Sequence, residues 1–61
     1  MTPQEYDNAP QEVKNILDSY NENEDSYKEC ERIIKELNLI GWTADYYLDG
    51  VLFDLEHISV F

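Results

Sequence analysis

Positive charge is scarce in this 61-residue chain: four Lys and Arg residues face 14 Asp and Glu residues, which gives a formal net charge of −10. Nucleic-acid binding depends largely on cations that neutralise phosphates, so this balance argues against direct contact with nucleic acid. Attachment to an anionic membrane surface is disfavoured for the same reason. The charge is compatible with a basic protein partner, with a metal ion, or with solubility alone.

Cysteine is also scarce, because Cys30 is the only one in the sequence. No intramolecular disulfide can form, and no Cys/His cluster indicates structural zinc. No apolar run approaches the ~20 residues that span a bilayer, and no secretory apolar segment follows Met1. We therefore expect one cytoplasmic domain over residues 1–61 that is stabilised by packing. An apolar fraction of 43% is enough for a small core.

Catalytic motifs are missing from the sequence, which contains no Gly-rich phosphate loop, no GxSxG and no HExxH. His57 lies near a predicted strand end and Cys30 on an apolar helix stripe, and both positions are typical of structural residues. The twelve-residue frame 18–29 does not fit a calcium loop, because Tyr20 and Asn23 occupy positions that require other residue types. The sequence thus predicts a protein that is not an enzyme and has no cofactor, and no metal-binding motif assigns ligand residues.

Two helical patterns precede the region of β pattern. Thr2, Pro3 and Glu5 form a helix start that predicts a short turn over residues 3–8, and Pro10 then interrupts it. Apolar residues at i, i+3, i+4 and i+7 predict a first main helix over about 10–20 and a longer one over about 24–40. Gly41 follows as a left-handed helix stop. Leu39 points away from the apolar stripe, so it is either exposed or covered by another molecule.

The period then changes from 3.6 to 2, and Asp49-Gly50 predicts a two-residue turn in a β-hairpin with strands over about 42–48 and 51–58. The predicted register places Asp45 opposite Asp54 and Tyr47 opposite Leu52. It turns one apolar set toward the core: Trp42, Ala44, Tyr46, Leu48, Val51, Phe53 and Leu55. The fold class is therefore α+β, with the two main helices on one face of a C-terminal antiparallel hairpin.

The other face of this predicted hairpin carries an acidic set with one apolar pair. Its members are Asp45, Tyr47, Asp49, Leu52, Asp54 and Glu56. Opposed aspartates destabilise a hairpin slightly, and a cationic partner would remove that repulsion. Three interpretations stay open at this point: a solvated face that supports the sheet, a recognition patch for a basic protein surface, and a metal site.

The run "ELNLIGWTADYYLDGVLFDLE", together with "TPQEY" near the start, resembles the C-terminal part of small acidic proteins encoded on bacterial phages and other mobile elements. The matching features are a Gly-aromatic helix exit and an Asp-Gly hairpin, which are structural, so no functional residue is carried over. The resemblance implies a small accessory protein that acts on a host or element-encoded partner.

The leading functional hypothesis is a protein-interaction module that binds a basic protein surface. Its most specific version is an inhibitor that mimics nucleic acid. The alternative is a structural or regulatory homodimer that uses open strand edges or the C-terminal tail. That interface would contain Leu39, Ile58, Val60 and Phe61.

Overall fold

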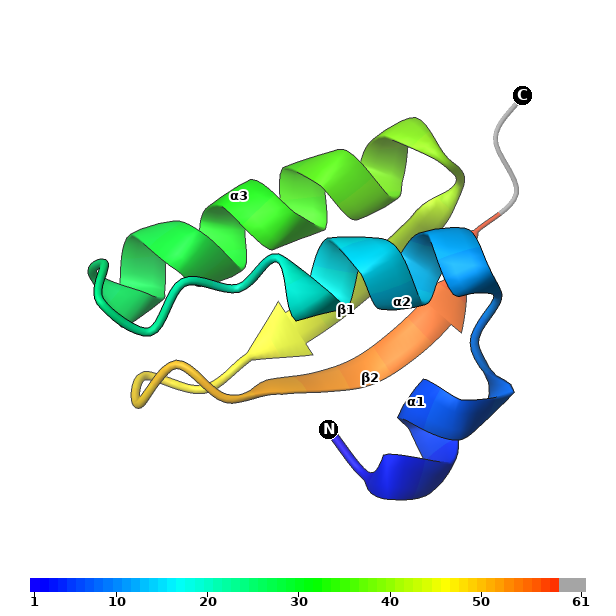
Figure 1. Ribbon diagram of the computed structural model, residues 1–61, viewed down its shortest axis with the longest axis horizontal. Helices are drawn as coiled ribbons and strands as arrows, with labels where there is room; N and C mark the ends of the chain where they lie inside the picture. Colours follow the sequence, from blue (N-terminus) through cyan, green and yellow to red (C-terminus); the bar gives the residue numbers. More distant parts are fainter. Residues whose placement is uncertain (59–61) are drawn as a thin grey trace.

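The computed structural model describes residues 1–58 of the chain, and it confirms an α+β fold (Figure 1). Three helices precede a two-stranded antiparallel hairpin. The elements are α1 (Pro3–Asn8), α2 (Gln11–Asp18), α3 (Ser26–Leu39), β1 (Trp42–Tyr46) and β2 (Leu52–His57). Each predicted helix and strand is present, and the differences lie at the element ends and in the pairing of the strands.

Helix α1 forms where the cap pattern predicts it. The Thr2 hydroxyl oxygen accepts from the Glu5 amide at 3.2 Å, and Pro3 occupies the first helical turn, where its missing N–H does no harm. Ala9 is extended and Pro10 starts a new segment, because a residue before proline is kept out of the helical region. Helix α2 ends at Asp18, two residues earlier than expected.

Helix α3 begins at Ser26 rather than at residue 24, because Asp25 is its cap. One carboxylate oxygen of Asp25 accepts from the amides of Tyr27, at 2.9 Å, and Lys28, at 3.2 Å. At the other end, Gly41 has a φ of 81°, which confirms the predicted left-handed stop after the helix. The chain therefore turns directly from α3 into β1.

The core lies between the two longer helices and the inner face of the hairpin. Its buried residues are Ala9, Val13, Cys30, Ile33, Leu37 and Ala44. Ile33 and Leu37 are fully buried, and each such side chain contributes about 1.5–3 kcal/mol relative to exposure. Helix α3 contacts both α2 and β1, so it is the element that joins the helical layer to the sheet.

The hairpin turn differs from the prediction by one residue. The Tyr47 amide donates to the Val51 carbonyl at 2.9 Å, and the Gly50 amide donates to the Tyr47 carbonyl at 2.9 Å. The loop therefore contains three residues, Leu48, Asp49 and Gly50, and Gly50 has a φ of 87°. A three-residue loop also needs a left-handed residue at its end, so the Asp-Gly pair fits both loop lengths.

A β-bulge compensates for this extra loop residue. Near the turn, Asp45 faces Phe53, one position from the predicted register, whereas Thr43 still faces Glu56 as predicted. Between these pairs β2 has two residues, Asp54 and Leu55, for one residue of β1. Asp54 adopts a φ of 51°, which Asp tolerates better than most side chains. The predicted opposition of Asp45 and Asp54 is therefore wrong.

The changed register reverses which side chains face the core near the turn. Leu52 was expected on the outer face, but it packs against the core. Phe53 was expected inside, but it lies opposite the exposed Asp45 on the outer face. Leu48 and Val51 were also expected inside, and they are 89% and 45% exposed. A one-residue shift produces all of these differences, because side chains alternate between the two faces.

Candidate functional site

The outer hairpin face, defined here by Asp45, Tyr47, Phe53 and Glu56, is the strongest candidate surface. Its centre is a stacked aromatic pair: the rings of Tyr47 and Phe53 lie 4.1 Å apart at 16°. Tyr47 remains 55% exposed in this stack. Stacked rings on a strand present rigid apolar area without loss of much side-chain freedom on binding, which suits them as contact anchors.

Phe53 is the residue of this face that the sequence prediction missed. With a two-residue turn, Phe53 falls inside and Leu52 takes its place beside Tyr47. No local sequence signal separates the two cases, because the Asp-Gly pair fits both loop lengths, and Leu48 is seen to belong to the loop only in the folded hairpin. The other predicted surface residues, Asp45, Asp49, Asp54 and Glu56, are exposed together with Tyr47.

The hairpin contains carboxylates but no Lys or Arg. Four acidic residues lie between positions 42 and 57, and the last cation of the sequence is Lys35. One of these acids is also structural, because a carboxylate oxygen of Asp49 accepts from the Val51 amide at 3.2 Å within the turn. The charge that the hairpin itself carries is therefore entirely negative.

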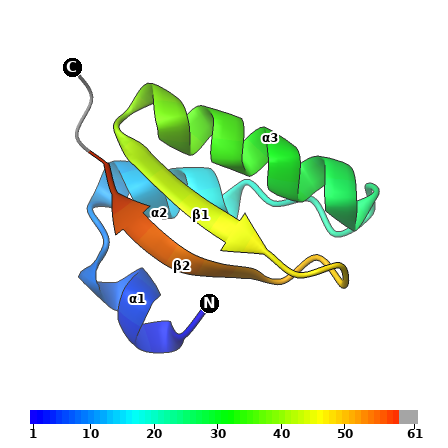
Figure 2. The same ribbon diagram turned by 180° about the vertical axis from the view of Figure 1, so that it is seen from behind.

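The tip of the hairpin packs on the first turn of α3, which extends the acidic surface. The Cys30 thiol donates to the Gly50 carbonyl at 3.2 Å, and a Cβ placed on Gly50 would come within 2.5 Å of Ser26 Cβ. This contact places the hairpin tip at the same end of the molecule as the connection between α2 and α3 (Figure 2). The exposed acids of that connection are Glu22, Glu24 and Asp25.

Exposed apolar side chains also gather toward this end. Tyr47, Leu48 and Val51 surround the turn, and Leu48 is 89% exposed. Tyr27, in the first turn of α3, is 44% exposed and meets the ring of Tyr46 edge to face at 5.1 Å. Tyr27, burial and Glu31 together raise the pKa of Tyr46 to about 12. The result is apolar surface bordered by carboxylates.

Arg32 is engaged in holding the helices together rather than in neutralising this surface. Its guanidinium donates to both Glu29 oxygens, at 2.8 and 2.9 Å, and to the Ser19 carbonyl at 3.0 Å. The remaining guanidinium nitrogen, Nη1, donates to a carboxylate oxygen of Glu36. The guanidinium and the Asn21 amide, 2.9 Å from Glu29, lower the pKa of the Glu29 carboxyl. This ion pair, in which Glu29 is buried and Arg32 is partly exposed, links α3 to the end of α2 through the Ser19 carbonyl.

The residues of the proposed dimer interface lie elsewhere. Leu39 is 86% exposed near the end of α3. Ile58 is partly buried, and its amide donates to the Gly41 carbonyl at 2.8 Å, so it continues the pairing of the hairpin. Val60 and Phe61 lie outside the described residues.

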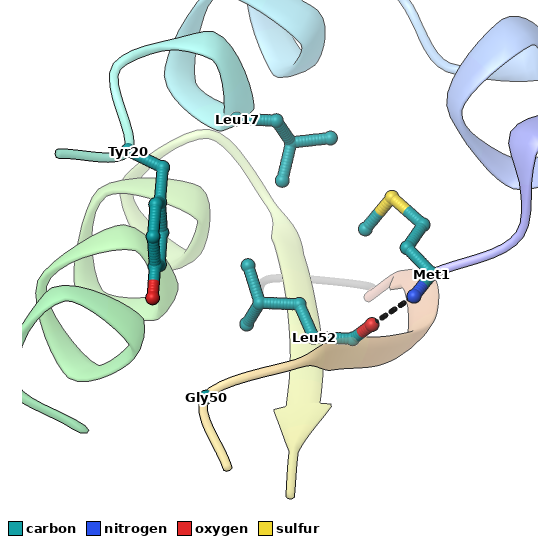
Figure 3. A pocket seen from close by; sticks show the side chains of 5 residues that line it. All are labelled: Met1, Leu17, Tyr20, Gly50 and Leu52. Carbon is teal, nitrogen blue, oxygen red and sulfur yellow. Dashed lines mark hydrogen bonds between the residues drawn. The ribbon is translucent and has the colours of Figure 1, made fainter. Parts of the chain in front are cut away.

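Two open hollows of about 240 Å³ each are lined in part by the first nine residues and in part by β2. One is lined by Met1, Leu17, Tyr20, Gly50 and Leu52, and the Met1 nitrogen donates to the Leu52 carbonyl at its edge (Figure 3). Its lining is mainly apolar. The other is lined by Glu5, Asn8, Ala9, Trp42 and Leu55. Neither lining set combines a nucleophile with a base.

Two further observations bear on metals and membranes. Over residues 1–58, no three His, Cys, Asp or Glu side chains come together in an arrangement that could hold a metal ion. None of the helices in this part of the chain combines the length and apolar character needed to cross a bilayer.

Comparisons of the chain with protein-family models, curated proteins and solved structures gave no match.

Proposed function

We propose that this chain is a non-catalytic interaction module that binds a basic protein surface through its outer hairpin face. The observation that carries the proposal is the exposed Tyr47–Phe53 stack on a hairpin whose charged residues are all acidic. The aromatic rings supply apolar contact area, and the carboxylates supply attraction and orientation toward Lys and Arg. No bound cofactor is required for this activity.

The most specific form of the proposal is an inhibitor that occupies a nucleic-acid-binding site. Such a mimic needs carboxylates spread over a continuous surface, so that they take the places of phosphates against Arg and Lys. The packing of the hairpin tip on α3 supports this form, because it brings Asp49 to the same end as Glu24 and Asp25. An accessory protein of a phage or mobile element that acts on a host protein would fit this role.

Affinity capture from a bacterial lysate tests the proposal. The surface variant is Asp45→Asn, Tyr47→Ser and Asp54→Asn, in which Asn keeps the tolerance for the left-handed conformation at position 54. The matched control is Asp7→Asn with Glu12→Gln, which removes the same charge from exposed positions on α1 and α2.

We expect the unmodified chain and the control to retain a basic protein that the surface variant loses. Because the attraction is between exposed charges, release is expected well below ~1 M salt, where the screening length is about 3 Å. Equal retention by all three baits, or retention that persists in ~1 M salt, would contradict the proposal.

A homodimer is the competing proposal, and the 86% exposure of Leu39 is the observation that favours it. Light scattering at millimolar protein concentration separates the two. A monomer in ~0.5 M salt, where self-repulsion is screened, would exclude the homodimer. A dimer that dissociates on Leu39→Lys substitution would support it.

A further inference from the structure

The hairpin loop carries apolar side chains at positions where turns usually have polar ones. Leu48 is the first of the three loop residues and is 89% exposed, and Val51, directly after the loop, is also exposed. Gly, Asn, Asp, Pro and Ser dominate turns because each stabilises the turned backbone, and leucine does not. Neither side chain belongs to the core or packs against it within residues 1–58. Leu48 and Val51, named the apolar tip here, are therefore available for contact with another molecule.

The loop that carries the apolar tip is fixed by hydrogen bonds. The Tyr47 amide donates to the Val51 carbonyl at 2.9 Å, and the Gly50 amide donates to the Tyr47 carbonyl at 2.9 Å. A carboxylate oxygen of Asp49 accepts from the Val51 amide at 3.2 Å. The Cys30 thiol donates to the Gly50 carbonyl at 3.2 Å, which ties the loop to α3. A loop ordered in this way has little backbone freedom left to lose on binding.

The exposure of Leu48 indicates the shape of the surface that can cover it. A side chain with nine tenths of its area exposed projects from the protein, because a side chain in a groove is shielded by its neighbours. A flat surface would cover such a side chain on one side only. Its burial therefore requires a concave, apolar site in the other molecule, of the kind that accepts the anchor residues of protein interfaces.

The charges near the apolar tip indicate what borders that concave site. Lys28 is the only Lys or Arg between positions 21 and 31, and the hairpin has none. The complementary border therefore carries Lys or Arg, whereas a second copy of this chain would bring another net charge of −10. The exposed acids in the loop and at the same end of the molecule are Asp49, Glu22, Glu24 and Asp25 (Figure 2).

We propose that the apolar tip inserts, with Leu48 foremost, into an apolar cleft of the partner protein whose border carries Lys or Arg. This inference rests on the proposed function, and it adds that the partner's site is a cleft and that the tip is the anchor. The Tyr47–Phe53 stack then lies against the border of the cleft, where the carboxylates of the hairpin meet the cations of the partner.

Photo-crosslinking tests the inference, because it reports contact at one chosen position. Photo-leucine, a leucine analogue that carries a diazirine, replaces Leu48 in one chemically synthesised full-length chain. The matched control carries it in place of Leu39, which is 86% exposed and lies at the opposite end of α3 from the loop. Each chain is irradiated in a bacterial lysate, and mass spectrometry identifies the crosslinked protein and its crosslinked residues.

We expect the chain labelled at position 48 to crosslink to a basic protein, at apolar residues flanked by Lys or Arg, and the chain labelled at position 39 not to do so. With that protein purified, Leu48→Ser should weaken binding at least about tenfold, because the burial of a leucine side chain is lost. Leu39→Ser should change the affinity less than about twofold, since it lies outside the anchor. Circular dichroism checks that both Ser variants keep their fold.

Other results would overturn the inference. If the Asp45→Asn, Tyr47→Ser and Asp54→Asn variant loses the partner but Leu48→Ser binds it as the unmodified chain does, the proposed function stands and insertion of the tip is wrong. Equal crosslinking from positions 48 and 39 leads to the same conclusion. Crosslinks from position 48 that join two copies of the chain would identify the occupant as a second copy. If the lysate yields no basic partner at all, the proposed function and this inference fail together.

Discussion

At the scale of single residues, Asp54 combines an unusual backbone with an exposed side chain. Its φ of 51° is the one positive value at a non-glycine position within residues 1–58. Left-handed conformations are unfavourable for side chains branched at Cβ and free of penalty for glycine. The bulge is therefore maintained by the surrounding pairing, against the intrinsic preference of the residue.

We expect Asp54→Val to lower the free energy of unfolding by about 1–2 kcal/mol, and Asp54→Gly to leave it unchanged or to raise it by about 0.5 kcal/mol. Asp54→Asn is the control, because it removes the charge and keeps the tolerance for positive φ. Urea unfolding measures all three. Equal stability of the Val and Asn variants would mean that the bulge is absent in solution.

Glu29 gives a prediction on pH. Arg32 and the Asn21 amide lower the pKa of this carboxyl in the folded chain, so the unfolded chain binds its proton more readily. The resulting stabilisation is complete above the ordinary Glu pKa of about 4.3, and it is lost as the pH falls through the lower folded value.

Urea midpoints of the native chain and Glu29→Gln should therefore differ at pH 7, and the difference should shrink as the pH falls below the ordinary Glu pKa of about 4.3 and through the lower folded value. Glu31→Gln, an exposed site on the same helix, is the control for the loss of one negative charge. A difference between the native chain and Glu29→Gln that is independent of pH would show that Arg32 does not stabilise the ionised carboxyl.

At the scale of elements, the hairpin tip and the first turn of α3 form one contact. Gly50 fits against Ser26 only without a side chain, because an added Cβ would lie 2.5 Å from Ser26 Cβ and 3.3 Å from the Tyr20 hydroxyl. The positive φ of Gly50 adds a conformational penalty for any other residue.

We expect Gly50→Ala to destabilise the fold by about 2 kcal/mol or more, as a sum of the conformational penalty and the steric conflict. Ser26→Gly in the same chain should recover the steric part, and a double-mutant cycle measures the coupling. Additive effects would contradict the contact between the tip and α3.

The sequence predicts the elements well because each has a local signal. The apolar stripe of α3 and the stop at Gly41 depend on residues close in the chain. The register of β1 and β2 is less predictable. Asp49-Gly50 fits two loop lengths, and no residue next to Asp54 in the sequence indicates a bulge there. The identity of Phe53 as a surface residue depends on both, so the centre of the candidate face is visible only in the folded chain.

At the scale of the whole molecule, charge repulsion opposes folding. Fourteen acidic residues face four cations, and Arg32 is already engaged with Glu29 and Glu36. Compact chains of high net charge are destabilised by self-repulsion, and salt screens it over about 8–10 Å at 0.1–0.15 M.

The thermal midpoint should therefore rise as NaCl increases from ~20 mM to ~0.5 M, by several degrees for a domain of this size if repulsion opposes folding by about 1 kcal/mol. Calorimetry at pH 7 measures the change. A midpoint that falls with salt would show that the Arg32 pairs outweigh the repulsion among the remaining carboxylates.

The position of Cys30 under the hairpin tip has a kinetic consequence. Its side chain is fully buried and its thiol bonds to Gly50, while burial and nearby Glu29 raise the pKa of that thiol. A thiol reagent in solution can reach the sulfur only when the tip lifts from α3. The rate of thiol labelling therefore reports how often this end of the molecule opens, and a partner seated on the hairpin would slow that rate without any direct contact with Cys30.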